Sequence, residues 1–166
     1  MDFKVGDKVV YPNHGVGLIE QISQGNSVSQ PQCFYLLKIV SNGLKVMVPA
    51  SNAATVGLRR IIRSSDVKKI LAYLSNGKCD SHRDWKWRFK ENSEKMRSGS
   101  LLQVAEVLKS LAALSKTKAL SFREKKMLDR ARFLLTGELA TVRGVSEATI
   151  EQNIIAALAK ARLHLP

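Results

Sequence analysis

Residues 57–74 read GLRRIIRSSDVKKILAYL, and within this stretch the spacing of apolar residues changes from that of a strand to that of a helix. Residues 58–62 suit a short final strand. Ser65 and Asp66 follow as helix-starting residues, and an apolar i, i+3, i+4, i+7 stripe then runs to Leu74. The stretch therefore predicts two domains of different class, residues 1–62 and residues 63–166.

The chain before this stretch has the pattern of a small β domain. We expect strands over residues 7–11, 17–22, 34–40 and 44–48, separated by turn residues. Asn42-Gly43 is typical of a two-residue hairpin turn. Four or five short strands in about 60 residues predict a small, strongly bent antiparallel β-barrel.

The chain after this stretch has helical periodicity. Besides the stripe at 67–74, we expect helices over residues 85–97, 101–108, 128–135 and 150–161. Ser100-x-x-Gln103 and Ser121-x-x-Glu124 have the form of capping boxes, and Gly137 marks the end of the fourth helix. Each stripe is too short to be stable alone, which predicts one bundle of about five helices. The fold class is therefore α+β with two domains.

Composition points to a polyanionic partner. The chain has 166 residues, of which 45% are apolar, so it can bury a core. Lys and Arg number 27 against 14 Asp and Glu, a net charge of +13. Residues 61–166 hold 21 basic and 11 acidic side chains, so most of this excess lies in the helical part. Nucleic acid is the first candidate partner and an anionic membrane surface the second.

The sequence predicts a soluble cytoplasmic protein. Its longest apolar run is residues 154–159, far shorter than a membrane-spanning helix needs, and its N-terminus lacks the apolar core of a signal peptide. Cys33 and Cys79 form neither a disulfide framework nor a zinc pattern. His14, His82 and His164 share no spacing with acidic residues or cysteines that suggests a triad or a metal site. We therefore expect no catalytic residue, no metal and no cofactor.

Residues 83–90, RDWKWRFK, combine four cations with three aromatic rings. Cations neutralise phosphates, and flat rings stack on bases or wedge between them. The alternative is structural, because the helical period places Trp85, Phe89 and Met96 near one face. On that basis Trp85 is a core residue and Trp87 is exposed, although a first-turn side chain can also project past the helix end.

A second basic run is Arg123-Glu-Lys-Lys126. Such a run is usually a solvated helix face, and Asp129 offers Lys125 an i, i+4 partner. However, Lys125 lies near a helix start, where the macrodipole disfavours a cation. This mild cost suggests another use for the run.

Five motifs resemble the CarD family of bacterial transcription regulators. The N-terminal one is Phe3-Lys-Val-Gly-Asp-x-Val-Val-Tyr-Pro-x-His-Gly15. The others are Trp85-x-x-Arg88-Phe-Lys90, Val104-Ala-Glu-Val107, Glu124-Lys125-x-Met-Leu128 and Gly137-Glu-Leu-Ala140. The first motif is also similar to the polymerase-interacting domain of the transcription-repair coupling factor. The helical motifs, without any ATPase motif, indicate the stand-alone regulator.

The resemblance implies a specific mechanism. The first domain would be a Tudor-like barrel that docks on the β subunit of RNA polymerase through a strand edge, here Val46, Met47, Val48 and Pro49. The second would bind promoter DNA at the upstream edge of the bubble, with Trp85 as a minor-groove wedge that stabilises the open complex. The implied DNA-binding residues are Trp85, Trp87, Arg88, Lys90, Lys125 and Lys126. We expect a monomer with no enzymatic activity.

Several positions depart from the family pattern. Met47, Gly25 and Leu114 stand where some relatives carry basic side chains, so the implied polymerase and DNA contacts differ there. Trp87 also replaces a basic residue and either adds to the wedge or covers it. The rival interpretation is a free-standing basic nucleoid protein that binds DNA without RNA polymerase.

Overall fold

The computed structural model describes residues 3–12, 14–25, 33–76 and 84–166. These residues divide into two compact units, the first ending at Ile61 and the second beginning at Ile62. Each unit buries an apolar core of its own.

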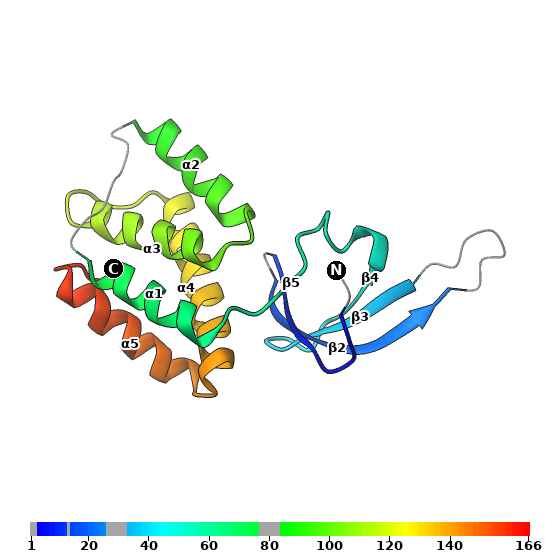
Figure 1. The fold of residues 1–166 in the computed structure, drawn as a ribbon. Coiled ribbons are helices and arrows are strands. Elements are labelled where there is room, and N and C mark those ends of the chain that lie inside the picture. The colour runs from blue at the N-terminus through cyan, green and yellow to red at the C-terminus, as the bar shows by residue number, and fades with distance from the viewer. Residues whose placement is uncertain (1–2, 13, 26–32, 77–83) are drawn as a thin grey trace. The chain divides into compact units, whose positions relative to one another are not determined.

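The first unit is an antiparallel sheet of five strands in the order β4-β3-β2-β1-β5 (Figure 1). The strands are β1 (Lys8–Tyr11), β2 (Gly15–Gln24), β3 (Cys33–Ile39), β4 (Lys45–Pro49) and β5 (Arg59–Arg60), and the short 3-10 helix η1 (Ala50–Asn52) follows β4. A register shift between Ile19 and Gln21 marks a β-bulge in β2. Among the described residues no pairing joins β4 to β5, so the sheet is open, and its closure into a barrel stays a prediction.

The turn between β3 and β4 is longer than the sequence predicts. Lys38 lies opposite Lys45, and the N–H of Ile39 donates to the carbonyl oxygen of Leu44 at 2.8 Å. Residues 40–43 are therefore the loop, and Gly43 ends it with a left-handed φ of 70°. Asn42-Gly43 is thus the second half of a four-residue loop, and the predicted two-residue turn is wrong.

The core of the sheet follows from alternation along its strands. Val48 of β4 is 3% exposed, whereas its neighbour Met47 is 59% exposed. Because successive side chains on a strand point to opposite faces, β4 presents one apolar face to the core and Met47 to the outside. The buried residues of this unit are Phe3, Val9, Ile19, Tyr35, Leu37, Val48, Ala53 and Leu58.

The second unit contains the five predicted helices. They are α1 (Ser64–Ser75), α2 (Trp85–Arg97), α3 (Leu101–Ser115), α4 (Phe122–Arg143) and α5 (Glu147–Lys160). The predicted N-caps Ser100 and Ser121 each accept a hydrogen bond from a backbone N–H inside their helix. The fourth helix does not end near Gly137 but continues to Arg143, where Gly144 caps it in the left-handed conformation with φ 66°.

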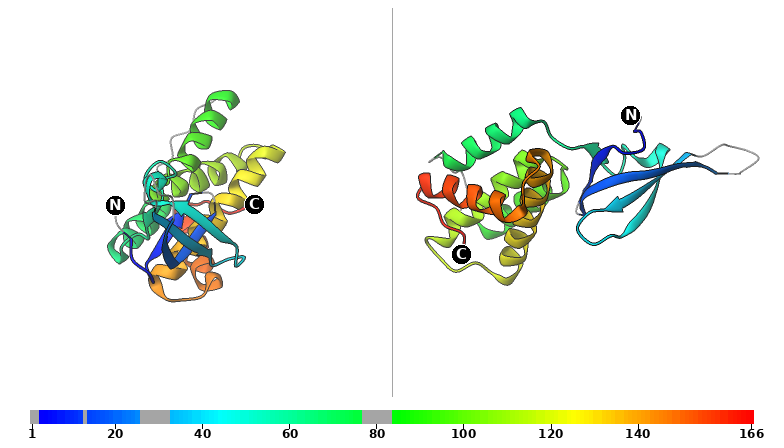
Figure 2. Two further views of the ribbon diagram at one scale, coloured as in Figure 1. Left: turned by 90° about the vertical axis from the view of Figure 1, so that its right-hand side faces the viewer. Right: turned by 90° about the horizontal axis from the view of Figure 1, so that it is seen from below.

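The helix α3 is at the centre of the bundle. It carries nine buried residues and contacts α1, α2 and α4, while α5 packs on α1 and α4 (Figure 2). Two buried polar residues fix α1 at both ends. A Glu138 carboxylate oxygen accepts a hydrogen bond from the Ile62 N–H at 2.9 Å, just before α1 begins. At its other end, the fully buried Lys109 donates from Nζ to the Tyr73 carbonyl oxygen at 2.7 Å.

Candidate nucleic-acid interface

Trp85 occupies the first position of α2, and this position explains why its ring is accessible. The side chain of Asp84 accepts a hydrogen bond from the N–H of Lys86 at 3.1 Å and so caps the helix directly before Trp85. The Trp85 side chain is 38% exposed and stacks on Phe89, with ring centroids 5.6 Å apart and planes at 18°. The burial that the helical period predicts for Trp85 is therefore wrong.

The buried face of α2 is formed by other residues. Arg88, Asn92 and Met96 are buried, each one turn from the next. Trp87 is 60% exposed, as its position in the period predicts. It lies about 200° around the helix from Trp85, so the two rings face different sides of α2.

Arg88, which was predicted to contact DNA, lies inside the protein. Its Nε is 3.2 Å from a carboxylate oxygen of Glu124, and the two side chains are only 3% and 2% exposed. The Glu124 carboxylate also accepts hydrogen bonds from the N–H and the hydroxyl of Ser121, at 3.3 and 3.1 Å, which confirms the predicted capping box of α4. One carboxylate thus joins the first half of α2 to the first turn of α4, and Arg88 is not a surface contact.

Across this junction lies a group of rings and cations that we call the aromatic–basic surface. Arg123 lies over the Phe89 ring at 5.9 Å, which connects the two helices, and Lys126 lies over the Phe122 ring at 4.6 Å. Phe122 is 71% exposed although it is large and apolar. The members of the surface are Trp85, Phe89, Phe122, Arg123 and Lys126.

Phe122 and Arg123 were not among the residues predicted from the sequence. The signal that could have found them is the predicted N-cap at Ser121, which places Phe122 and Arg123 at the first two positions of α4, next to the basic run. A large ring such as Phe122 at that position is left in solvent, where it can meet a partner.

Two predicted lysines lie on the same two helices as the aromatic–basic surface. Lys90 is exposed and lies over the Trp87 ring at 5.5 Å. Lys125 is exposed on the first turn of α4, and in the described part of the chain it forms no ion pair with Asp129 or any other acid. Lys125 is therefore available to an external anion.

In the first unit, the predicted polymerase-binding residues lie on an edge strand. Val46 and Pro49 are half-buried, Val48 is buried and Met47 is exposed. In an antiparallel ladder, pairs that exchange hydrogen bonds alternate with pairs that do not. The N–H of Ile39 donates to the carbonyl oxygen of Leu44, so these two residues form a hydrogen-bonded pair. By the alternation, Lys45 and Met47 lie in pairs with β3 that are not hydrogen-bonded. Their backbone N–H and C=O groups therefore point away from β3, toward the open edge. This edge can accept an additional strand.

Comparison with known proteins identifies the family. The model of the CarD-like/TRCF RID domain matches residues 3–62, and that of the CarD C-terminal domain matches residues 69–155. The chain belongs to the CarD family. This confirms the resemblance inferred from the motifs. CarD family proteins are transcription regulators and not a known class of enzyme, and this CarD protein is accordingly assigned to transcription regulation.

Two relatives illustrate the match. "Putative transcription factor YdeB" of Bacillus subtilis (strain 168) is 34% identical over 149 residues, which cover 90% of this chain and 97% of the relative. The solved structure "CdnLNt from Myxococcus xanthus" is 45% identical, covers 37% of this chain and 87% of its own, and gives a TM-score of 0.31.

Neither a metal site nor a membrane-spanning helix is found in the described part of the CarD protein. No group of three or more His, Cys, Asp or Glu side chains there is arranged to hold a metal ion. No helix among the described residues has the length and hydropathy needed to cross a membrane.

Proposed function

We propose that this CarD protein binds the β subunit of RNA polymerase through the β4 edge and stabilises the open promoter complex through Trp85. Residues 1–62 would form the polymerase-binding domain and residues 63–166 the DNA-binding domain. The observation that carries the proposal is the Trp85 ring, which is 38% exposed and stacked on Phe89, the ring over which Arg123 of α4 lies.

A wedge acts by lowering the free-energy cost of opening a duplex step. An apolar ring inserted at a minor-groove step replaces part of the stacking that is lost when the step opens. The stack on Phe89 fixes the orientation of the Trp85 ring, so that little rotamer freedom is lost on insertion. Such a ring binds opened DNA more tightly than closed duplex and shifts the equilibrium between them toward the open form.

The cations of α2 and α4 would supply binding without reading sequence. Arg123, Lys125 and Lys126 lie near the start of α4, and Lys90 lies on α2. Contacts from these side chains to phosphates would release counterions and place the ring at the bubble edge. The buried Arg88 is left out of this set, and its role is to hold α2 against α4.

The open edge of β4 supports docking on polymerase by strand addition. A strand of the β subunit that pairs with the outward backbone groups of Lys45 and Met47 would extend the sheet, and the exposed Met47 side chain would add an apolar contact. Pro49 has no N–H, so it limits pairing at the end of the strand.

The test compares two variants of equal size, Trp85→Ala and Trp87→Ala. Stacking of a base on an aromatic side chain is worth about 1–3 kcal/mol, so Trp85→Ala should shorten the lifetime of the open complex about fivefold or more. Lifetimes are measured by challenging preformed complexes with a competitor. Both rings are substantially exposed, so both variants should fold, which circular dichroism checks. An unchanged lifetime in Trp85→Ala would refute the wedge, and a loss confined to Trp87→Ala would transfer the role to Trp87.

The rival function is a free-standing DNA-binding protein, which the excess positive charge also supports. A pull-down from nuclease-treated lysate separates the two functions. The CarD protein should retain the β subunit when DNA is gone, whereas a free-standing nucleoid protein should lose it.

A further inference from the structure

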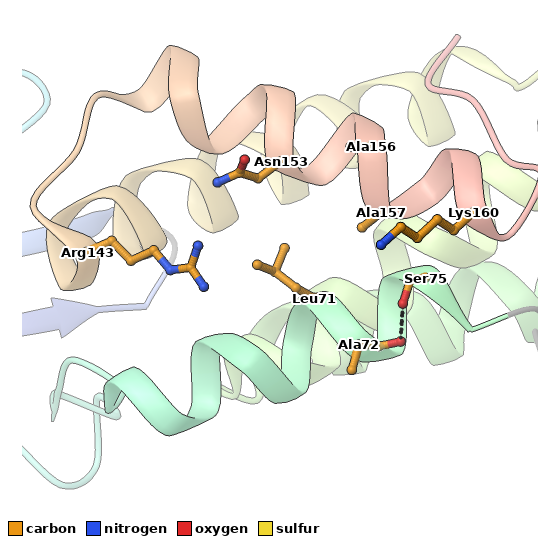
Figure 3. A pocket seen from close by; sticks show the side chains of 8 residues that line it. All are labelled: Leu71, Ala72, Ser75, Arg143, Asn153, Ala156, Ala157 and Lys160. Atoms are coloured by element: carbon orange, nitrogen blue, oxygen red, sulfur yellow. Dashed lines mark hydrogen bonds between the residues drawn. The ribbon is translucent and has the colours of Figure 1, made fainter.

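A pocket on the second unit is lined by residues that the proposed function does not use. It lies between α1 and α5, has a volume of about 370 Å³ and is lined by Leu71, Ala72, Ser75, Arg143, Asn153, Ala156, Ala157 and Lys160 (Figure 3). This volume is within the range of about 300–1,000 Å³ that is typical of ligand sites. Arg143 ends α4 and Phe122 begins it, so the pocket is roughly 30 Å along that helix from the aromatic–basic surface.

The charges of this pocket are all of one sign. Figure 3 shows the guanidinium of Arg143 and the ammonium of Lys160 extending toward Leu71 from opposite sides, with the Asn153 amide nearby. No acidic residue lines the pocket, and neither cation has an ion-pair partner among the described residues. The helix dipole favours a cation in the last turn of α4 and of α5, but it does not explain why both side chains turn into one pocket.

The floor between the two cations is apolar. Leu71 and Ala72 come from α1, and Ala156 and Ala157 come from α5. The short alanine side chains leave room above Leu71. The Ser75 hydroxyl already donates to the Ala72 carbonyl oxygen at 2.9 Å, so it offers only lone pairs to a ligand.

We propose that this pocket binds an acidic peptide segment of a partner protein. One carboxylate of the segment would pair with Arg143 and another with Lys160, while an apolar side chain between them would cover Leu71. Charge complementarity requires an anion here, and the apolar floor selects a peptide over a nucleic-acid backbone. A phosphodiester placed against alanine and leucine would lose hydration of its charge without gaining a hydrogen bond or an ion pair from them. An aliphatic side chain in the same place would be stabilised, because its apolar surface is removed from water.

The experiment uses the full chain and labelled peptides. The probe is a set of fluorescein-labelled hexapeptides that combine Glu or Asp with Leu, Ile or Phe, and a matched set has Lys in place of the acids. Fluorescence anisotropy should detect binding of acidic peptides and none of the basic set. Amide chemical-shift changes should concentrate on α1, α5 and the end of α4.

Charge-reversal variants test the assignment. Arg143→Glu and Lys160→Glu should each weaken peptide binding, and the double variant should weaken it at least tenfold. Lys118→Glu, an exposed cation outside the pocket, is the matched control and should change the affinity less than twofold. All three residues are exposed, so folding should survive, which thermal melts check.

Three results would overturn the proposal. One is that no acidic peptide binds up to millimolar concentration. Another is that Lys118→Glu loses as much affinity as the pocket variants, which would mean that general charge attraction explains the binding. The third is that the pocket variants lose duplex DNA affinity and keep peptide affinity, which would assign the pocket to phosphates. None of these results depends on Trp85, so they leave the proposed open-complex function untouched.

Discussion

Breaking the buried Arg88–Glu124 pair tests how α2 and α4 are held together. Arg88→Met keeps most of the apolar length of the side chain but leaves the Glu124 carboxylate buried without this cation. Removing one partner of a buried ion pair costs about 3–5 kcal/mol. Because Glu124 keeps two hydrogen bonds from Ser121, we expect a loss in the free energy of unfolding near the lower end, about 3 kcal/mol. In a unit of this size the melting temperature should fall by about 12 °C.

The assay is urea unfolding followed by tryptophan fluorescence. Both tryptophans of the chain lie in α2, so fluorescence reports on the helical unit. Glu124→Gln is the matched second variant, since its amide oxygen can still accept from the Ser121 N–H. The double variant has no unpaired buried charge, so the two single losses should not add, and the coupling free energy should be about 2 kcal/mol. Losses that add within about 0.5 kcal/mol would refute the pair as a unit.

Three other perturbations each act on a single group. Lys125→Ala removes a cation without an ion-pair partner in the described structure. Duplex binding measured by anisotropy should weaken similarly for all sequences, and the salt slope should fall by about 0.9; an unchanged slope would exclude a phosphate contact. Met47→Pro removes an outward N–H that Met47→Ala keeps. Only the proline variant should therefore lose the β subunit in pull-downs, and equal retention by the two variants would contradict strand addition. Lys109→Met removes the donor to the Tyr73 carbonyl, which should lower stability to urea by about 2 kcal/mol; no loss would mean that this bond adds no net stability.

The elements of the fold are predictable from the sequence because their signals are local. Alternation with turn residues predicts each strand, and i, i+3, i+4 stripes predict the existence of each helix, although α3 and α4 extend well beyond their stripes, to Ser115 and from Phe122 to Arg143. The end of α4 was missed because a glycine inside a helix costs only about 1 kcal/mol. Gly137 is therefore tolerated there, and the left-handed Gly144 is the true end. Closure of the sheet into a barrel stays a prediction, because strand pairing is set by contacts far apart in the chain.

The candidate site was predicted in its chemistry but not in its geometry. The dense run of rings and cations at residues 83–90 predicts that α2 contacts DNA, and this stays a prediction. The helical period nevertheless places Trp85 inside and gives Arg88 no reason to be buried. Trp85 is exposed because it is the first residue of α2, and Arg88 is buried because Glu124, 36 positions away in sequence, stabilises its charge in the core. Periodicity treats an arginine as polar wherever it occurs, so a buried ion pair between two helices is invisible to it.

The two proposed attachments would contribute in different ways, which makes their variants distinguishable. A ring worth about 1–3 kcal/mol and a few phosphate contacts bind DNA weakly on their own. Anchoring on polymerase would raise the local concentration of the ring at the promoter to the millimolar range, so weak contacts suffice. Loss of the anchor in Met47→Pro should therefore be overcome by adding more protein, because free protein replaces the missing local concentration. Adding more protein should not overcome the loss of the ring in Trp85→Ala. Without the ring, the protein binds open and closed DNA equally, so saturating the promoter with it leaves the ratio of open to closed DNA unchanged.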